Sequence, residues 1–154
     1  FNLAGLVGSY HLVFDRVLKE RMDKESSLCH YNSMNIFSQY AILGGYSEEG
    51  ALWVEELRQV IDQNIRFALE FINTRIPGVR VSAPQGTYML FLDCTDWCAA
   101  HGLTIEELLK KGFEYGVIWQ DGTAFHGPCH IRMNLALPFT RVQEAFRRLE
   151  EYVF

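Results

Sequence analysis

The sequence lacks the features that mark nucleic-acid-binding and membrane-spanning proteins. Its net charge at pH 7 is −5, and no cluster of lysine and arginine forms the basic surface that nucleic acid or an anionic membrane would bind. No apolar run approaches the roughly 20 residues that a helix needs to span a bilayer, and the first residues lack the pattern of a signal peptide. We therefore expect no nucleic-acid partner, no membrane partner and a cytoplasmic location.

Cysteine is scarce and irregularly spaced. The four cysteines are Cys29, Cys94, Cys98 and Cys129. They lie in apolar surroundings without the dense spacing of a disulfide framework, which favours reduced and mostly buried thiols. His126 and His130 lie close to Cys129 in the sequence, but the spacing matches no common set of zinc ligands. We expect no metal site.

What the sequence does contain is apolar and aromatic material for a packed core. Of the 154 residues, 49% are hydrophobic and 14% are aromatic, which suffices for one domain or for one domain plus part of another. No internal repeat and no low-complexity segment is present.

Apolar patterns divide the chain into strands and helices. Residues 8–14 form an apolar run typical of a strand with neighbours on both sides, yet the chain offers few strands that could supply them. We therefore expect the chain to be part of a longer protein. Ser47 is placed to cap the longest helix, which ends before Pro77 and Gly78 and is expected to be roughly 40 to 45 Å long. Such a helix either bridges two domains or packs within one. The other predicted helices of this half are 15–24 and 32–44.

The last half predicts a small α+β layer in which helices cover one side of a sheet. Thr104 and Glu107 form the pattern of a capping box, as do Thr140 and Gln143. The predicted strands are 79–82, 87–94, 117–119 and 131–137, and the predicted helices begin at residues 104 and 140.

Arg132 is the residue that breaks the pattern of its strand. It lies between Ile131 and Met133, where a guanidinium is rarely placed without a partner that offsets its desolvation. One interpretation is structural, with Arg132 solvated on the polar face or paired with a nearby Asp or Glu. The other is that its planar fork of donors binds a carboxylate or phosphate of a ligand.

Three stretches, in order, resemble the C-terminal half of fold type I pyridoxal-phosphate enzymes. They are FNLAGL at 1–6, PQGTYMLFLDC at 84–94, and GVIWQDG at 116–122 followed by IRMNLALP at 131–138. The resemblance is greatest to the cystathionine β-lyase and aminotransferase group that includes MalY- and PatB-type proteins. It implies the end of an α/β large domain at 1–45, a connecting helix at 46–77 and a small α+β C-terminal domain at 78–154.

The resemblance also implies the site and its cofactor. In the family, the lysine that forms the Schiff base with pyridoxal phosphate directly precedes the FNLAGL segment, so no catalytic residue and no covalently bound cofactor is expected in this chain. The family's cofactor-binding segments find no counterpart here, so no cofactor-binding residue is assigned. Arg132, Asn134, Ala136 and Pro138 reproduce the R-x-N-x-A-x-P pattern, whose arginine binds the α-carboxylate of an amino-acid substrate.

The resemblance predicts an enzyme that acts on amino acids, as a C–S β-lyase of cystathionine- or cysteine-type substrates or as an aminotransferase, and as a homodimer. The chain alone is then expected to be inactive. One departure is the short FHGPCH loop at 125–130, which is longer and richer in glycine and glutamate in the lyases. His126, Cys129 and His130 of this loop either act on the substrate or are solvated, inert residues. An alternative for the whole chain is a stand-alone binding or assembly module without chemistry.

Overall fold

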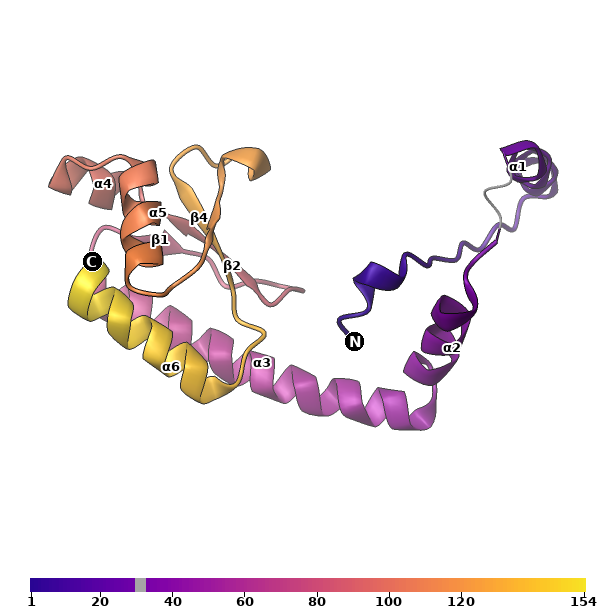
Figure 1. Ribbon diagram of the computed structural model, residues 1–154, viewed down its shortest axis with the longest axis horizontal. Helices are drawn as coiled ribbons and strands as arrows, with labels where there is room; N and C mark the ends of the chain where they lie inside the picture. The colour runs from indigo at the N-terminus through magenta and orange to yellow at the C-terminus, as the bar shows by residue number, and fades with distance from the viewer. Residues whose placement is uncertain (30–32) are drawn as a thin grey trace. The chain divides into compact units, whose positions relative to one another are not determined.

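The computed structural model describes residues 1–29 and 33–154, which separate into two compact units, Phe1–Glu56 and Leu57–Phe154. The boundary falls inside helix α3, Glu48–Arg75 (Figure 1). This helix confirms the long element predicted for 46–77, and Ser47 caps it by accepting a hydrogen bond from the backbone N–H of Gly50 at 3.0 Å. The division of the chain into domains at 45 and 77 stays a prediction. Among the described helices, none is both long and apolar enough to cross a membrane.

The first unit is built around the start of helix α2. Its elements are η1 (Ala4–Leu6), α1 (Arg16–Cys29), α2 (Ile36–Gly45) and the beginning of α3. Asn35 caps α2 by accepting from the backbone N–H of Ser38 at 2.9 Å. The side chains of Asn35 and Ser38 both donate to the carbonyl oxygen of Leu6, at 3.1 and 2.5 Å. The Phe1 and Trp53 rings stack 5.3 Å apart, so contacts between residues distant in the sequence hold the first residues against α2 and the start of α3.

The strand predicted for 8–14 is wrong. This run has no regular structure, and the side chains of Leu12 and Phe14 are 75% and 94% exposed. A strand needs a neighbour for its backbone groups, and the described residues of this unit, 1–29 and 33–56, contain none. The helices predicted for 15–24 and 32–44 are confirmed as α1 and α2, although residue 32 lies outside the described part of the chain.

The second unit is a four-stranded antiparallel sheet with helices on one face, as predicted (Figure 1). In spatial order its strands are β1 (Arg80–Val81), β2 (Met89–Asp93), β4 (His130–Asn134) and β3 (Gln120–Asp121). Its helices are the C-terminal part of α3, α4 (Thr95–His101), α5 (Ile105–Glu114) and α6 (Phe139–Arg148), with the short 3-10 turn η2 (Thr123–Phe125) and the π-helix η3 (Leu149–Val153).

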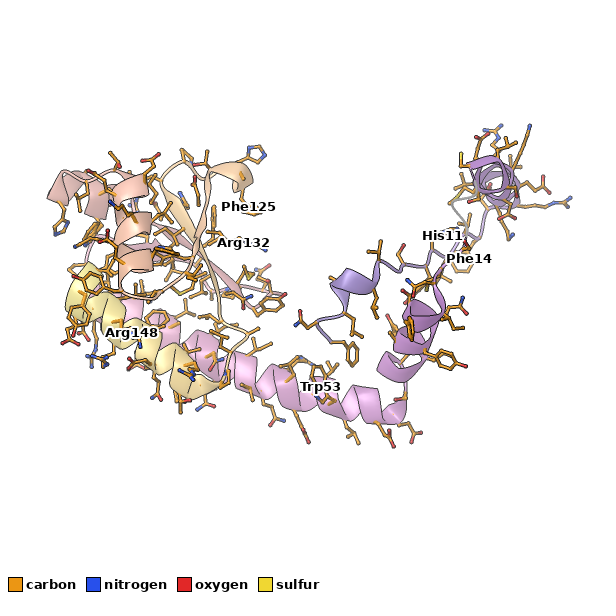
Figure 2. The ribbon with its side chains drawn as sticks, viewed as in Figure 1. His11, Phe14, Trp53, Phe125, Arg132 and Arg148 are labelled. Carbon is orange, nitrogen blue, oxygen red and sulfur yellow. The ribbon has the colours of Figure 1, made fainter. Side chains whose placement is uncertain are left out.

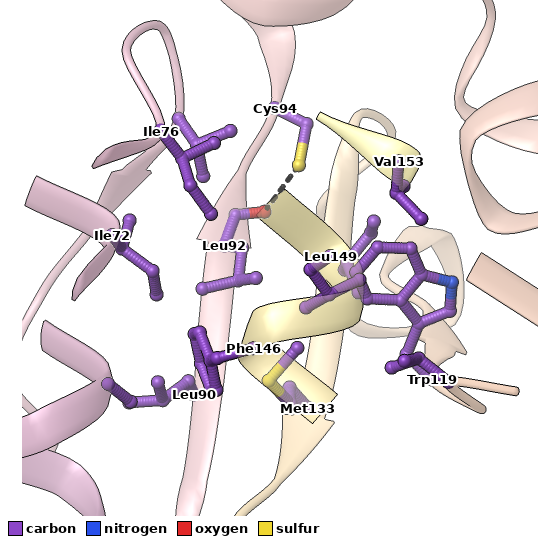
Figure 3. Close-up of a cluster of buried hydrophobic side chains, with 14 of the residues drawn as sticks. Ile72, Ile76, Leu90, Leu92, Cys94, Trp119, Met133, Phe146, Leu149 and Val153 are labelled. Carbon is purple, nitrogen blue, oxygen red and sulfur yellow. Dashed lines mark hydrogen bonds between the residues drawn. The ribbon is translucent and has the colours of Figure 1, made fainter. Parts of the chain in front are cut away.

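The two faces of this sheet differ because side chains alternate along a strand. Leu90 and Leu92 of β2 and Ile131 and Met133 of β4 are buried. They pack against buried residues of α3, α6 and η3 such as Ile72, Phe146 and Leu149 (Figure 3). The residues between them, including Phe91 and Arg132, therefore point to the opposite face, called the open face below.

Three local predictions need correction. Residues 117–119 form no strand, because the backbone N–H of Val117 donates to Gly112 O at 2.8 Å and the Trp119 indole donates to Leu109 O at 3.1 Å, which ties the segment to α5. Helix α6 begins at Phe139 without the capping box predicted at Thr140. Residues 95–101 form the unpredicted helix α4. The capping box of Thr104 and Glu107 is confirmed.

Strand β4 ends at Asn134, earlier than predicted, because side chains satisfy the backbone beyond it. The Asn134 side-chain oxygen accepts from the backbone N–H of Ala136 at 2.8 Å, which turns the chain. Asn64 of α3 is fully buried and its amide donates to the carbonyl oxygens of Leu135 and Leu137, both at 2.8 Å. One amide thus fixes the connection between β4 and α6.

We predict that Asn64→Ala lowers the free energy of unfolding by about 2 to 4 kcal/mol, because it leaves two carbonyl groups without a donor. Urea unfolding followed by tryptophan fluorescence measures the loss. The matched control is Asn73→Ala on an exposed part of the same helix, for which we expect a change within about 0.5 kcal/mol. Equal effects of the two substitutions would contradict the role assigned to Asn64.

Candidate functional site

The candidate site is centred on Arg132, in the middle of β4 on the open face. Arg132 lies directly opposite Phe91 of β2 on one side and Gln120 of β3 on the other. Its neighbours along the strand, Ile131 and Met133, are buried in the core on the other face. The backbone therefore presents the Arg132 side chain away from the core.

Among the described residues, one side chain accepts a hydrogen bond from the Arg132 guanidinium and one aromatic ring lies over it. Its Nη1 donates to the Gln120 side-chain oxygen at 2.9 Å, and its central carbon lies 4.6 Å from the centre of the Phe125 ring (Figure 2). Within residues 1–29 and 33–154, no carboxylate forms an ion pair with Arg132 and no acceptor receives a hydrogen bond from its Nε or Nη2. The ion pair between Arg132 and a nearby Asp or Glu, which the sequence left open, is therefore absent from these residues.

Phe125 reaches Arg132 from the short η2 turn. The turn is closed by the backbone N–H of Phe125, which donates to Gly122 O at 2.8 Å. The Asp121 carboxylate accepts from the backbone N–H of Thr123 at 2.9 Å, and this hydrogen bond holds the pKa of Asp121 below its usual value. A side chain at Gly122 would come within 2.6 Å of His130 O, so the tight approach of η2 to β4 requires glycine there.

A pocket of about 420 Å³ opens beside Arg132. Its other lining residues are Tyr88, Met89, Ile118, Trp119, Gln120 and Asn134. None of them carries a formal charge, so Arg132 is the only cation in the lining of this pocket. The arrangement can bind an anion of a small molecule by charge and by hydrogen bonds.

The sequence alone does not reveal Gln120 and Phe125 as partners of Arg132. Gln120 lies in the GVIWQDG stretch, but a register that places it opposite a residue in another strand cannot be read from the stretch alone. Phe125 lies in a loop, where spacing gives no periodic signal. The tertiary structure brings both residues to one guanidinium.

The loop histidines take different positions. The His130 ring stacks on Phe91 with centroids 4.7 Å apart, and its buried Nδ1 has no hydrogen-bond partner among the described residues. His126 is exposed and adopts a left-handed backbone conformation with a φ of 62°. In the described part of the chain, neither ring forms a hydrogen bond to Arg132. A direct role in chemistry for either one stays a hypothesis.

All four cysteines lie in described residues and are free thiols. Burial raises the pKa of Cys94 to about 12 and that of Cys98 to about 11, with the neighbouring Cys129 adding to both. Thiols of this kind are poor nucleophiles at neutral pH. The residues that the structure describes contain no group of three or more His, Cys, Asp or Glu side chains placed to hold a metal ion.

The described residues place no lysine beside Arg132 to which pyridoxal phosphate could be attached. No lysine lines the pocket beside Arg132. Lys19 and Lys110 form ion pairs along their own helices, and Lys111 donates to Val153 O at 2.9 Å. The described residues therefore fit the binding of a carboxylate and do not by themselves fit the covalent attachment of the cofactor.

Asp93 is a second charged group at the open face. A pocket of about 800 Å³ includes Asp93, Arg80, Phe91 and His130 in its lining. The Asp93 carboxylate accepts from the backbone N–H of Thr95 and from the Arg80 guanidinium, both at 3.0 Å. These hydrogen bonds, those from Thr95 first, lower the pKa of Asp93 from 3.8 to about 2.

The chain is similar in sequence to curated proteins. Cystathionine beta-lyase PatB of Bacillus subtilis (strain 168) is 29% identical over 153 residues, which cover 97% of this chain and 38% of PatB. Protein MalY of Escherichia coli (strain K12) is 22% identical over 94% of this chain and 37% of its own length. The chain thus spans less than two fifths of these relatives. No protein-family model matches it.

Solved structures show the same fold. One match is a pyridoxal-phosphate-bound protein from Clostridium difficile 630 that is described as an aminotransferase. The match covers all of this chain and 39% of the aminotransferase chain. The TM-score is 0.83 and the identity is 32%. The pyridoxal-phosphate-bound C–S lyase from Staphylococcus hominis matches 99% of this chain and 38% of its own, with a TM-score of 0.83 and 22% identity.

We predict that ionised Asp93 stabilises the fold above about pH 4 and that this stabilisation is lost as the pH falls toward 2, because the folded state lowers the pKa. Asp93→Asn should cost about 1 kcal/mol at pH 6, after allowance for solvent screening, and roughly a third of that at pH 2.5. Urea unfolding at the two pH values measures the difference. Asp62→Asn, at an exposed helix position, is the control, and an equal pH dependence for both variants would contradict the assignment.

Proposed function

We propose that this chain, which is related in sequence and fold to the C-terminal portion of fold type I pyridoxal-phosphate-dependent C–S lyases and aminotransferases, binds the α-carboxylate of an amino-acid substrate through Arg132. The intact protein would then be an enzyme of this class. Arg132 is its substrate-binding residue in this chain, and the lysine that attaches the cofactor lies outside the chain.

The observation that carries this proposal is an arginine on the open face of a sheet whose charge has no carboxylate partner among the described residues. Its two contacts, with Gln120 and Phe125, are both to neutral groups. A guanidinium binds a carboxylate through two parallel hydrogen bonds, which fixes the orientation of the bound molecule as well as its position. An amino acid held in this way has its α-carbon placed for reaction, which is catalysis by positioning.

Pyridoxal phosphate, when bound in the intact enzyme, supplies the electron-accepting ring on which both reactions depend. The contribution of this chain is to hold the substrate carboxylate. β-Elimination and transamination both begin with loss of the α-proton, so the same carboxylate clamp serves either reaction. The relatives include proteins named for each activity.

The intact protein is further proposed to be a cytoplasmic homodimer. A homodimer is consistent with the large amount of exposed apolar surface on the first unit, which includes Val7, Phe37 and Leu43. Four free thiols are consistent with a cytoplasmic location. The chain by itself is proposed to be inactive, since it lacks a lysine at the Arg132 pocket.

We predict that Arg132→Ala in the intact protein lowers kcat/KM for its amino-acid substrate by an amount equivalent to about 2 to 5 kcal/mol, because a charged hydrogen-bonding pair is lost from the transition state. The unfolding free energy should change little, since no ion pair is broken in the described residues. Steady-state kinetics and urea unfolding on the same preparations separate the two effects. Arg66→Ala, at an exposed helix position, is the matched control. A loss of stability with unchanged kinetics would refute the binding role.

The isolated chain should neither attach pyridoxal phosphate nor turn over cystathionine. After incubation with the cofactor and reduction with borohydride, mass spectrometry is expected to find no lysine that carries a stoichiometric adduct. The intact protein is the positive control and should carry one such adduct. A stoichiometric adduct on the isolated chain, or measurable release of thiol from cystathionine, would show that the chain holds the chemistry itself. A binding module would be favoured instead if the isolated chain is folded and monomeric and the intact protein also lacks the adduct.

A further inference from the structure

We infer that Gln120 and Phe125 are positioning residues that hold the Arg132 guanidinium in one orientation and leave its Nε and Nη2 for a carboxylate ligand. The inference rests on the proposed function of Arg132. It concerns two residues that touch the arginine rather than the substrate. The η2 turn, which ends at Phe125, thereby gains a role in holding the site.

An arginine on a strand needs such restraint because its side chain is long and rotates about several bonds. Its planar group binds a carboxylate well only when two of its N–H groups face the two oxygens. An unrestrained side chain loses rotational freedom on binding, which weakens the affinity. Contacts that fix the guanidinium before the ligand arrives remove part of this cost.

Gln120 fixes one end of the guanidinium. Its side-chain oxygen accepts from Nη1 at 2.9 Å, and its place directly opposite Arg132 in the sheet sets this contact. The amide is neutral, so it orients the arginine without neutralising its charge. A carboxylate at the same position would bind the guanidinium itself and compete with any ligand.

Phe125 covers one face of the guanidinium. Its ring centre lies 4.6 Å from the central carbon of the group, which is within the range of a cation–π contact. The ring belongs to no part of the buried core and is 46% exposed, so packing of the core does not explain its position. The η2 turn, closed through Gly122, carries it to Arg132.

Phe91, the neighbour of Arg132 on strand β2, contacts a different residue. Its ring stacks on His130 with centroids 4.7 Å apart. Arg132 is thus held by Gln120 at Nη1 and by Phe125 on one face, while its Nε and Nη2 have no acceptor among the described residues. These two nitrogens can donate in parallel, which matches the two oxygens of a carboxylate.

The test measures carboxylate binding by the intact protein without using turnover. The protein is labelled with isotopically enriched arginine, and the Nε–H resonance of Arg132, assigned by its absence from Arg132→Ala, is followed by NMR during titration with propionate. Propionamide, which has the same shape without the charge, is the control ligand. Wild type should show a saturable shift with propionate and none with propionamide.

Both positioning residues should affect this affinity. We expect Phe125→Ala to weaken propionate binding about 5-fold to 10-fold, and Phe125→Tyr, which keeps the ring, to remain within about 2-fold. Gln120→Ala should weaken it by about 5-fold, and Gln120→Glu by more than about 10-fold because the new carboxylate competes for Arg132. Phe113→Ala, at an exposed helix position, should leave the affinity unchanged.

The outcomes separate this inference from the proposed function. If wild type shows no shift with propionate, Arg132 does not bind carboxylates and the proposed function fails. If wild type binds propionate and Phe125→Ala and Gln120→Ala bind it equally well, the proposed function stands and the positioning role is overturned. A weaker affinity with an unchanged melting temperature and recovery in Phe125→Tyr supports the role. Should Phe125→Ala fail to fold, the Gln120 variants decide in the same way.

Discussion

The alternation of side chains along β4 is the constraint on which the site depends. Burial of Ile131 and Met133 against the helices fixes the register and the facing of the strand, because a slip of one residue would bring Arg132 into the core. A guanidinium without a partner is costly there. The energy that packs the core therefore also places the arginine on the open face. Replacing Ile131 or Met133 would therefore disturb the position of Arg132, although neither side chain belongs to the site.

The segments on either side of β4 hold the strand and the arginine in place by polar contacts. At one end, the Asn64 amide satisfies the carbonyl groups of Leu135 and Leu137, so the chain leaves the strand at a defined angle and enters α6. At the other end, the tight approach of Gly122 to His130 places the η2 turn against the sheet. The asparagine of the R-x-N-x-A-x-P pattern has a physical explanation here, since its side chain closes the turn that ends the strand.

The loop that restrains Arg132 carries a free-energy cost of its own. Phe125 is a large apolar side chain left partly in water, and His126 beside it adopts a left-handed backbone conformation that non-glycine residues seldom take. Both belong to the short loop before β4. Strain and exposed apolar surface of this kind concentrate where side chains are held for binding rather than for packing, which agrees with the role inferred for the turn.

The periodic elements and the anomalous arginine can be recognised from the amino-acid sequence alone. The long helix, the capping box of Thr104 and Glu107, and the α+β layer follow from local spacing and short-range hydrogen bonds, and Arg132 is recognisable because an arginine in an apolar strand is unusual. Contacts between segments that are distant in the sequence are visible only once the chain is folded. Such contacts explain the positions of Gln120 and Phe125 at Arg132, the burial of Asn64, the attachment of residues 117–119 to α5 and the absence of a strand at 8–14. Spacing along the chain could not predict them, because partners that are far apart in the sequence leave no periodic signal.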